Sequence, residues 1–192
     1  MLSPRQEEII NKAILIIDEK GIQGLTIKNI AKAINTSEPA IYRHFDSKLD
    51  ILCTILNGFK ENIAQNAFII SQNAANPFDK MQLFYENILT RFVKNPSLIS
   101  VIFSEEIFQN DTHLAKKVMD IQQLNEDIVR DLLENLKKTK QIPESTDIDI
   151  FLLLFFGSLR HLVRQWKFGG HNFDLVEKGR VLFAEIVHPL KK

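Results

Sequence analysis

Polar side chains near the amino end have the types and spacing that suit contacts with DNA. Tyr42, Arg43, His44 and Lys48 bring hydroxyl, guanidinium, imidazole and ammonium donors into one short segment. Such donors bind phosphate oxygens, and arginine can also pair with the edge of a guanine. Ala40 is small enough to meet a thymine methyl group. The segment therefore predicts a surface that binds double-stranded DNA.

Three predicted helices would position these side chains. Ser3, followed by proline, is a strong start signal for a first helix, whose isoleucines repeat at helical spacing until Gly21 ends it. Thr26 begins a short second helix, and Asn35 can adopt the left-handed conformation of a tight turn. A third helix of about seven residues, capped by Ser37, follows. Helices this short need a packing partner, so we expect the first helix to support a projecting rod that enters a major groove.

The string Ile-Tyr-Arg-His-Phe-x-Ser-Lys at residues 41–48, with the run Leu25–Ile34 before it, resembles the TetR/AcrR family of bacterial and archaeal transcriptional regulators. The resemblance implies an all-α fold. A three-helix helix-turn-helix DNA-binding domain would occupy residues 1–48, and a helical effector-binding and dimerisation domain residues 49–192. Helix signals along the chain predict about nine helices, and no strand alternation stands out. The function implied is that of a ligand-responsive repressor, which binds a palindromic operator as a homodimer and is released by a small, apolar effector.

The resemblance also implies which residues touch DNA: phosphate contacts by Thr26, Lys28, Ser37, Tyr42, His44 and Lys48, and base contacts by Arg43 and residues 36–40. The predicted DNA-binding set is Thr26, Lys28, Thr36, Ser37, Glu38, Pro39, Ala40, Tyr42, Arg43, His44 and Lys48.

Four members of this set have alternative interpretations, and one of them, His44, would be an ordinary surface residue if it stood outside this string. Glu38 can be a favourable charge at a helix start instead of a base reader, and Arg43 can form an exposed ion pair. Thr36 stands where the family usually has valine, within Asn35-Thr36-Ser37 in place of Gly-Val-Ser, and it can either pack or touch DNA. A scaffold that does not bind DNA would make the whole cluster a solvated surface.

Long helices are predicted after the third helix. One starts at Asp46 or Ser47, and others lie at about 78–94, 97–109, 111–140, 146–168 and 172–187. The segment 148–163 is apolar on nearly every side, so it must be covered all round. We expect one face to meet the domain core and another to meet a second copy of the chain, with 172–187 as its companion. The resemblance implies the same four-helix interface, and an effector that tilts the fourth helix and so changes the spacing of two recognition helices.

Aromatic residues concentrate after residue 48 and could line an apolar effector pocket, with a cationic side chain holding an anionic head group. The candidate ligand-binding residues are Phe84, Tyr85, Phe103, Phe108, His113, Phe155, Phe156, Arg160 and Arg164. The alternative is that these aromatic side chains simply form core. A long-chain acyl compound fits this composition, as do many other apolar effectors.

Composition and motifs limit which other classes of protein the sequence could belong to. The formal net charge is zero, so the position of charge must attract DNA. Cys53 is the single cysteine, which excludes an intramolecular disulfide and a cysteine-based zinc site. Signal-peptide and membrane-spanning patterns are missing, so we expect a cytoplasmic protein without membrane contact. Glu185 and His188 have the spacing of one half of a helical di-iron motif, but such sites need two motifs and two further glutamates. We predict a regulator that is not an enzyme and uses no cofactor or metal.

Overall fold

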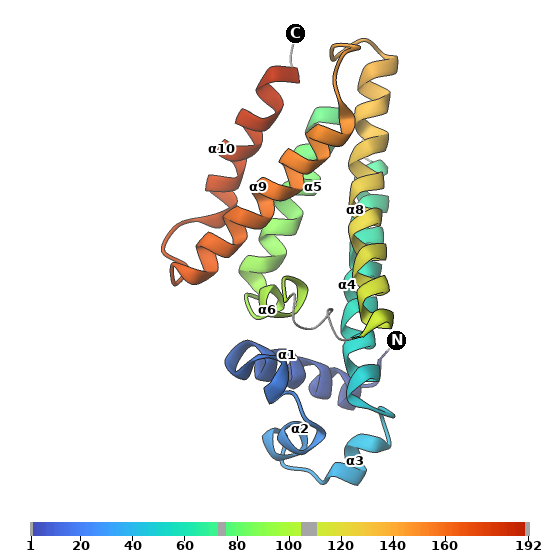
Figure 1. Ribbon diagram of the computed structural model, residues 1–192, viewed down its shortest axis with the longest axis vertical. Coiled ribbons are helices and arrows are strands. Elements are labelled where there is room, and N and C mark those ends of the chain that lie inside the picture. The colour runs from blue at the N-terminus through green and yellow to red at the C-terminus, as the bar shows by residue number, and fades with distance from the viewer. Residues whose placement is uncertain (1, 73–75, 105–110, 191–192) are drawn as a thin grey trace. The chain divides into compact units, whose positions relative to one another are not determined.

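The computed structural model describes residues 2–72, 76–104 and 111–190. In these ranges it contains nine α-helices, one short 3-10 helix and no strand (Figure 1), which confirms the predicted all-α fold. The chain divides into two compact units. Unit 1 comprises Met1–Glu61 and Pro96–Ile121, and unit 2 comprises Asn62–Asn95 and Gln122–Lys192. Among the described residues, none of the helices combines the length and apolarity that crossing a bilayer requires.

The first helix of unit 1, α1 (Pro4–Gly24), begins as its sequence predicts. The Ser3 hydroxyl accepts a hydrogen bond from the Gln6 amide, and the Gln6 side chain accepts one from the Ser3 amide, which forms a capping box. Gly21 has a φ of 68°, so it interrupts the helical geometry where a stop was predicted. The chain nevertheless adds another turn after this kink, because Ile22 is buried in the core.

The turn between α2 (Ile27–Ala33) and α3 (Glu38–Tyr42) is a Schellman motif. Asn35 takes the left-handed conformation with a φ of 51°, as predicted, and its amide donates to the Lys32 carbonyl at 3.3 Å. The Thr36 amide donates to the Ala31 carbonyl at 2.9 Å. Asparagine thus satisfies the end of α2 at the position where glycine is usual. Both helices are two residues shorter than predicted, with seven and five residues, and this motif accounts for the early end of α2.

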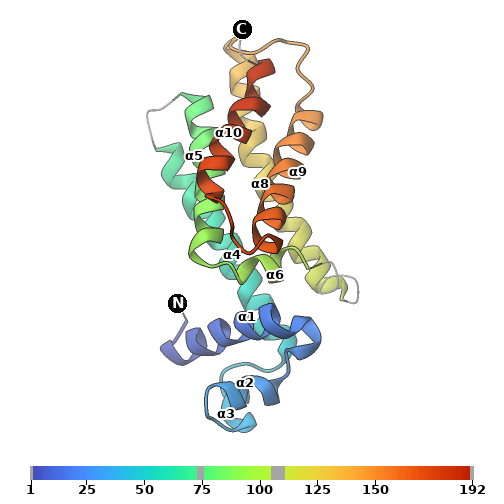
Figure 2. The same cartoon turned by 90° about the vertical axis from the view of Figure 1, so that its left-hand side faces the viewer.

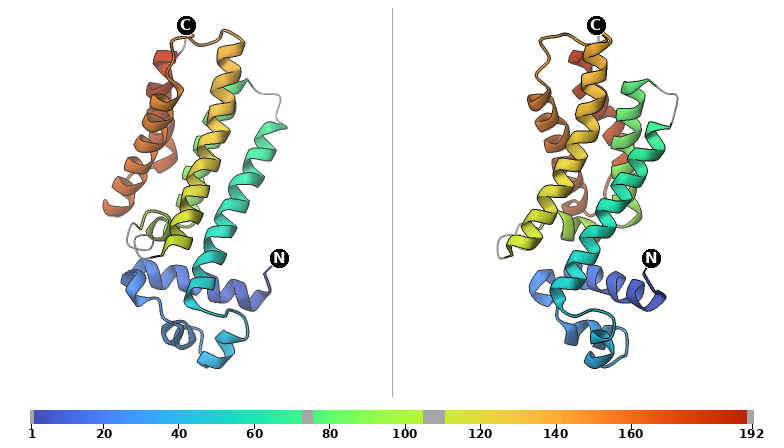
Figure 3. Two further views of the ribbon diagram at one scale, coloured as in Figure 1. Left: turned by 45° about the vertical axis from the view of Figure 1, so that its right-hand side comes forward. Right: turned by 90° about the vertical axis from the view of Figure 1, so that its right-hand side faces the viewer.

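Unit 1 is completed by the first part of α4 (Lys48–Ser71), by α6 (Leu98–Ile102) and by the start of α8 (Thr112–Lys138). The carboxylate of Asp18 on α1 accepts hydrogen bonds from the hydroxyls of Ser97 (2.9 Å) and Ser100 (2.6 Å), so α6 is fastened to α1. The prediction of one helix over 97–109 is wrong: α6 ends at Ile102, because the backbone of the next residue, Phe103, leaves helical geometry with a φ of −104° and a ψ of 13°. Figure 3 shows α4 and α8 side by side, and in unit 1 Lys117 bonds to Asn57 across them.

Unit 2 contains α5 (Pro77–Lys94), α9 (Ile148–Phe168) and α10 (Leu175–Val187), followed by the 3-10 helix His188–Leu190. Asparagine or aspartate side chains cap the starts of all three α-helices. Helix α10 packs on α5 and α9 (Figure 2). Gly179 makes the crossing with α5 tight: a Cβ at this position would stand 2.1 Å from the Leu89 Cδ1 atom.

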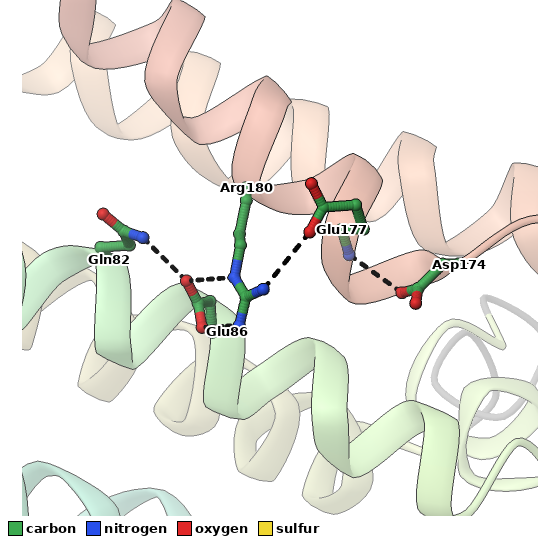
Figure 4. Close-up of polar contacts among 5 residues, drawn as sticks. All are labelled: Gln82, Glu86, Asp174, Glu177 and Arg180. Carbon is green, nitrogen blue, oxygen red and sulfur yellow. Dashed lines mark hydrogen bonds and ion pairs between the residues drawn. The ribbon is translucent and has the colours of Figure 1, made fainter.

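A polar network crosses the same seam between α5 and α10 (Figure 4). The guanidinium of Arg180 meets both carboxylate oxygens of Glu86, at 3.0 Å and 3.1 Å, and it also reaches Glu177 at 3.3 Å. The Gln82 side-chain amide donates to Glu86 Oε1, which also accepts from Arg180 Nε, at 2.8 Å. The hydrogen bond from Arg180 lowers the pKa of Glu86, against an opposing effect of burial. The paired hydrogen bonds between the Arg180 guanidinium and the Glu86 carboxylate fix the rotation of α10 relative to α5.

Candidate functional site

The short helix α3 presents the centre of the predicted DNA-binding set to solvent. Glu38, Pro39 and Tyr42 are exposed, whereas Ile41 between them is fully buried. Tyr42 is 51% exposed, so its aromatic ring and its hydroxyl are both accessible to solvent. Ser37 stands at the cap position of α3, but its hydroxyl makes no capping hydrogen bond there. The hydroxyls of Ser37 and Tyr42 can therefore meet phosphate oxygens.

The start of α2 supplies a second edge of the same candidate interface. Thr26 caps this helix, and its hydroxyl accepts a hydrogen bond from the Asn29 amide at 3.1 Å. Lys28 lies exposed in the first turn. Asn29 also donates to the Gly24 carbonyl at 2.7 Å, which ties α2 to the end of α1. A helix start with an exposed lysine attracts an anionic group.

Two members of the set, His44 and Lys48, are half-buried and hold the three-helix unit together. The Lys48 ammonium donates to the Ile22 carbonyl at 3.0 Å, so it connects the start of α4 with the last turn of α1. The His44 carbonyl accepts a hydrogen bond from the Gln6 side chain at 3.4 Å. The backbone carbonyl of His44 and the side chain of Lys48 thus stabilise the helix-turn-helix, in addition to any contact with phosphate.

The remaining members of the predicted DNA-binding set differ in their exposure to solvent and in the contacts that they make. Arg43 is exposed and makes no ion pair with the described residues, so its guanidinium is available for a base or a phosphate. Thr36 and Ala40 are half-buried. The Thr36 amide is used in closing α2, which fixes the backbone of this residue just before α3. Ile41 and Phe45 belong to the core, as their pattern predicts.

The predicted effector residues are only partly brought together. Phe84, Tyr85 and Phe155 are buried in unit 2 and Phe156 is half-buried. The Tyr85 and Phe155 rings meet edge to face with centroids 5.1 Å apart, and Phe155 meets Phe156 at 4.9 Å. Phe183 of α10 joins this cluster, 5.7 Å from Tyr85.

The other predicted effector residues do not belong to that cluster. Arg164 is exposed and its guanidinium lies 5.8 Å from the centroid of the Phe168 ring. Arg160 is half-buried in unit 2, whereas Phe103, half-buried, and His113, exposed, belong to unit 1. Phe108 lies outside the described residues.

Tyr85 has a particular electrostatic environment. Its hydroxyl has no hydrogen-bond partner among the described residues, although the side chain is fully buried. Burial raises the pKa of Tyr85 to about 12, and the nearby Ser158 hydroxyl offsets part of this effect. Ser158 itself donates to the Phe155 carbonyl at 3.1 Å. The phenol is therefore a neutral donor in apolar surroundings.

Sequence reasoning missed three residues of unit 2 that could contribute to binding. From the sequence, Phe183 belongs to a helix of the expected dimer interface, and Ser158 is only an interruption of an apolar segment. Arg91 on α5 is half-buried, and burial lowers its pKa to about 10. Its guanidinium donates to the Asn62 side chain at 2.7 Å. Only the packing of unit 2 shows that Phe183, Ser158 and Arg91 lie where they could contribute to binding, because none of the three positions belongs to a sequence motif.

Large apolar side chains remain exposed along α9 and at one position of α10. Each of the following is more than half exposed: Ile150, Leu153, Leu154 and Phe168 of α9, and Val181 of α10. The buried residues of α9 lie on its other side and include Phe151, Leu152 and Phe155. Helix α9 thus has one apolar face in the core and one in solvent, as its composition predicts. An exposed apolar helix face of this kind is typical of an interface.

No described group of three histidine, cysteine, aspartate or glutamate side chains is arranged to hold a metal ion. Glu185 and His188, the residues with the spacing of a di-iron half-motif, are both exposed. His188 lies at the start of the 3-10 helix, beyond the end of α10. The described residues around this pair supply no further ligand.

Comparisons with known proteins agree with this architecture. Residues 9–53 match the family described as "Bacterial regulatory proteins, tetR family", and residues 55–189 match "YsiA-like protein, C-terminal region". The chain is 27% identical over 190 residues to the biofilm operon negative transcriptional regulator IcaR of Staphylococcus aureus, covering 96% of each protein. It is 24% identical over 176 residues to the fatty acid metabolism regulator protein of Bacillus subtilis, covering 90% of this chain and 89% of that protein.

Solved structures share the fold. The regulator FadR of Bacillus subtilis in complex with stearoyl-CoA superposes with a TM-score of 0.82 at 22% identity, covering 96% of this chain and 98% of that one. The ketosteroid regulator KstR2 of Mycobacterium tuberculosis superposes with a TM-score of 0.84 at 18% identity, covering 100% and 97%. Both halves of the sequence and the arrangement of its helices point to one conclusion. The chain belongs to the TetR family of bacterial regulatory proteins.

Proposed function

We propose that this regulator is a repressor that binds a palindromic operator as a homodimer, and that a small apolar or amphipathic effector releases it. Residues 1–48 would contact DNA, and residues 49–192 would bind the effector and dimerise. The protein would work in the cytoplasm, by binding and without catalysis. The name of the relative IcaR, a negative transcriptional regulator, supports repression. The single observation that carries the proposal is the exposed face of α3 beside the positive start of α2.

The DNA contacts follow from the chemistry of that face. Lys28, with the start of α2 behind it, and the hydroxyls of Ser37 and Tyr42 would bind phosphates on the two sides of the groove. Arg43 would bind a base edge or a phosphate, because no described ion pair occupies it. Lys48 would have to exchange its bond to the Ile22 carbonyl for a phosphate, or share its protons between the two.

The homodimer would form through α9 and α10. The exposed apolar face of α9, with Val181 of α10, is the support for this interface. A two-fold axis would pair these helices with their copies and fix the two α3 helices at about 34–36 Å, one turn of DNA.

The effector would bind among the aromatic side chains of unit 2. Tyr85, Phe155, Phe156 and Phe183 form an apolar cluster that contains one neutral phenol. FadR of Bacillus subtilis, which shares the fold, forms a complex with stearoyl-CoA, and we propose that a long-chain acyl thioester is the effector class here as well.

The test measures the binding of the full-length protein to a labelled duplex by fluorescence anisotropy. The duplex carries an operator selected by the protein itself from random sequences. We expect two chains per duplex, an affinity that falls steeply with salt, and release on addition of stearoyl-CoA. The double variant Tyr42→Ala/Lys48→Ala should lose binding, whereas the matched double variant Phe68→Ala/Lys94→Ala, which changes an exposed phenylalanine of α4 and an exposed lysine of α5, should keep its phosphate contacts and salt slope. An affinity independent of salt, or equal binding by both double variants, would refute the DNA contacts proposed here.

A further inference from the structure

The exposed side of α9 has a glycine at its middle. Residues three and four apart lie on one side of a helix, so the exposed positions of α9 follow one another along a single stripe. Leu153 and Leu154, which are 69% and 59% exposed, precede the glycine by about one turn. In order, the stripe contains Ile150, Leu153, Leu154, Gly157, His161 and Arg164, all of them exposed. The apolar stripe thus has no side chain at its centre.

The packing of the chain does not require glycine at position 157. Outside its own stretch of helix, no described atom lies within 4 Å of the place that a Cβ would take there. Gly179 is different, because a Cβ at that position would stand 2.1 Å from Leu89 Cδ1. A glycine inside a helix weakens the helix relative to alanine. Glycine also permits the close approach of another backbone, and that benefit would offset the cost.

The charges along α9 favour a second copy of α9 that runs in the opposite direction. Asp147 caps the helix and Asp149 lies in its first turn, whereas Arg164 and Lys167 lie near its end. Asp149 pairs with Arg130 of α8, yet 79% of its side chain remains exposed. In an antiparallel pair, the acidic start of each helix lies beside the basic end of the other, and the helix macrodipoles oppose each other as well. A parallel pair would bring like charges together.

We propose that two copies of the chain pack their α9 helices antiparallel, with the two-fold axis passing beside Gly157. The inference rests on the proposed homodimer and assigns its register. Gly157 of one copy meets Gly157 of the other, so the two backbones approach closely. Leu153 of each copy lies level with His161 of the other, and the leucines pack around the crossing point.

Cysteine cross-linking of the full-length protein tests this register. In a Cys53→Ser background, we introduce Gly157→Cys, Leu153→Cys or His161→Cys and oxidise each variant with diamide. Gly157→Cys should form a covalent dimer about tenfold faster than either of the others, because a disulfide needs Cα atoms about 4.4–6.8 Å apart. The other two cysteines would each be displaced from their own copies by about 12 Å along the helix, at about 1.5 Å per residue. Co-expressed Leu153→Cys and His161→Cys chains should instead cross-link with each other.

A bulky side chain at the same position gives an independent measurement. Gly157→Leu should raise the dimer Kd about 100-fold in sedimentation velocity, because the added side chain enters the crossing from both copies. Circular dichroism should show unchanged helix content, since the space around this position is open within one chain. The matched control is Gly58→Leu on α4, where a Cβ would also meet open space but the exposed neighbours Asn57 and Glu61 are polar. This variant should keep the wild-type dimer Kd.

The outcomes separate the register from the homodimer itself. A stable dimer whose Kd is unchanged by Gly157→Leu would overturn the inference and leave the proposed homodimer intact. The same holds for a dimer in which Leu153→Cys cross-links with itself faster than Gly157→Cys does. A wild type that remains monomeric at micromolar concentration would overturn both.

Discussion

Leu153 should contribute strongly to self-association, because it is the most exposed aliphatic side chain on α9, at 69%. Burying a whole leucine side chain stabilises an interface by about 1.5–3 kcal/mol, so the exposed two-thirds is worth about 1–1.5 kcal/mol after allowing for the Cβ that alanine keeps. In a two-fold dimer each substitution occurs twice. The change Leu153→Ala should therefore weaken dimerisation by about 2–3 kcal/mol, which raises the dimer Kd about 30- to 150-fold.

Sedimentation velocity over a dilution series measures this shift directly. The matched control is Met119→Ala on α8, where a side chain of similar exposure, 66%, lies outside the proposed interface. We expect Met119→Ala to leave the dimer Kd unchanged, and circular dichroism to show that both variants remain helical. Equal dimer constants for Leu153→Ala and the wild type would refute the reasoning, as would a wild type that stays monomeric at micromolar concentration.

Three further changes test other parts of the structure. Lys28→Ala should remove one phosphate contact, so the slope of log affinity against log salt concentration should fall by about 0.9 in anisotropy titrations; an unchanged slope would exclude that contact. Asn35→Val should destabilise the protein by about 1–2 kcal/mol in urea unfolding, because Asn35 has a φ of 51°, whereas Asn35→Gly should be tolerated; equal effects would contradict the role of the left-handed turn. The pKa of Glu86 is lowered from an ordinary value of 4.5, so its contribution to stability is present above that pH and disappears as the pH falls through the lowered pKa. Glu86→Gln should therefore be less stable than the wild type at pH 7, and the difference should vanish in strongly acidic solution; a constant difference would exclude the ion pair as its source.

Local signals in the sequence predicted the helix-turn-helix well. The capping box at Ser3, the cap at Thr26 and the left-handed Asn35 each depend on a few neighbouring residues, so their types and spacing suffice. The helix end predicted at Gly21 was only partly confirmed. The Gly21 backbone leaves helical geometry as predicted, but α1 continues past it with the buried Ile22. The end of α6 at Ile102 was not predicted, because the apolar residues beyond it carry no stop signal.

The effector residues were harder to predict, since their roles depend on contacts between distant helices. The sequence marks Phe183 only as a residue of the helix at 172–187, which is expected at the dimer interface, and the structure places it against Tyr85. Lys48 was predicted to contact phosphate, and its bond to the Ile22 carbonyl depends on how α1 ends. No sequence signal indicates that the Tyr85 hydroxyl is buried without a described partner.

The central claim is that two copies of α3 read one duplex together, and the most direct measurement is the selection of bound sites from a pool of random duplexes. Sequencing the duplexes retained by the full-length protein should recover two inverted half-sites, with centres about 10 base pairs or a multiple of a helical turn apart. Recovery of a single half-site without an inverted copy, or of no enriched sequence, would contradict the account.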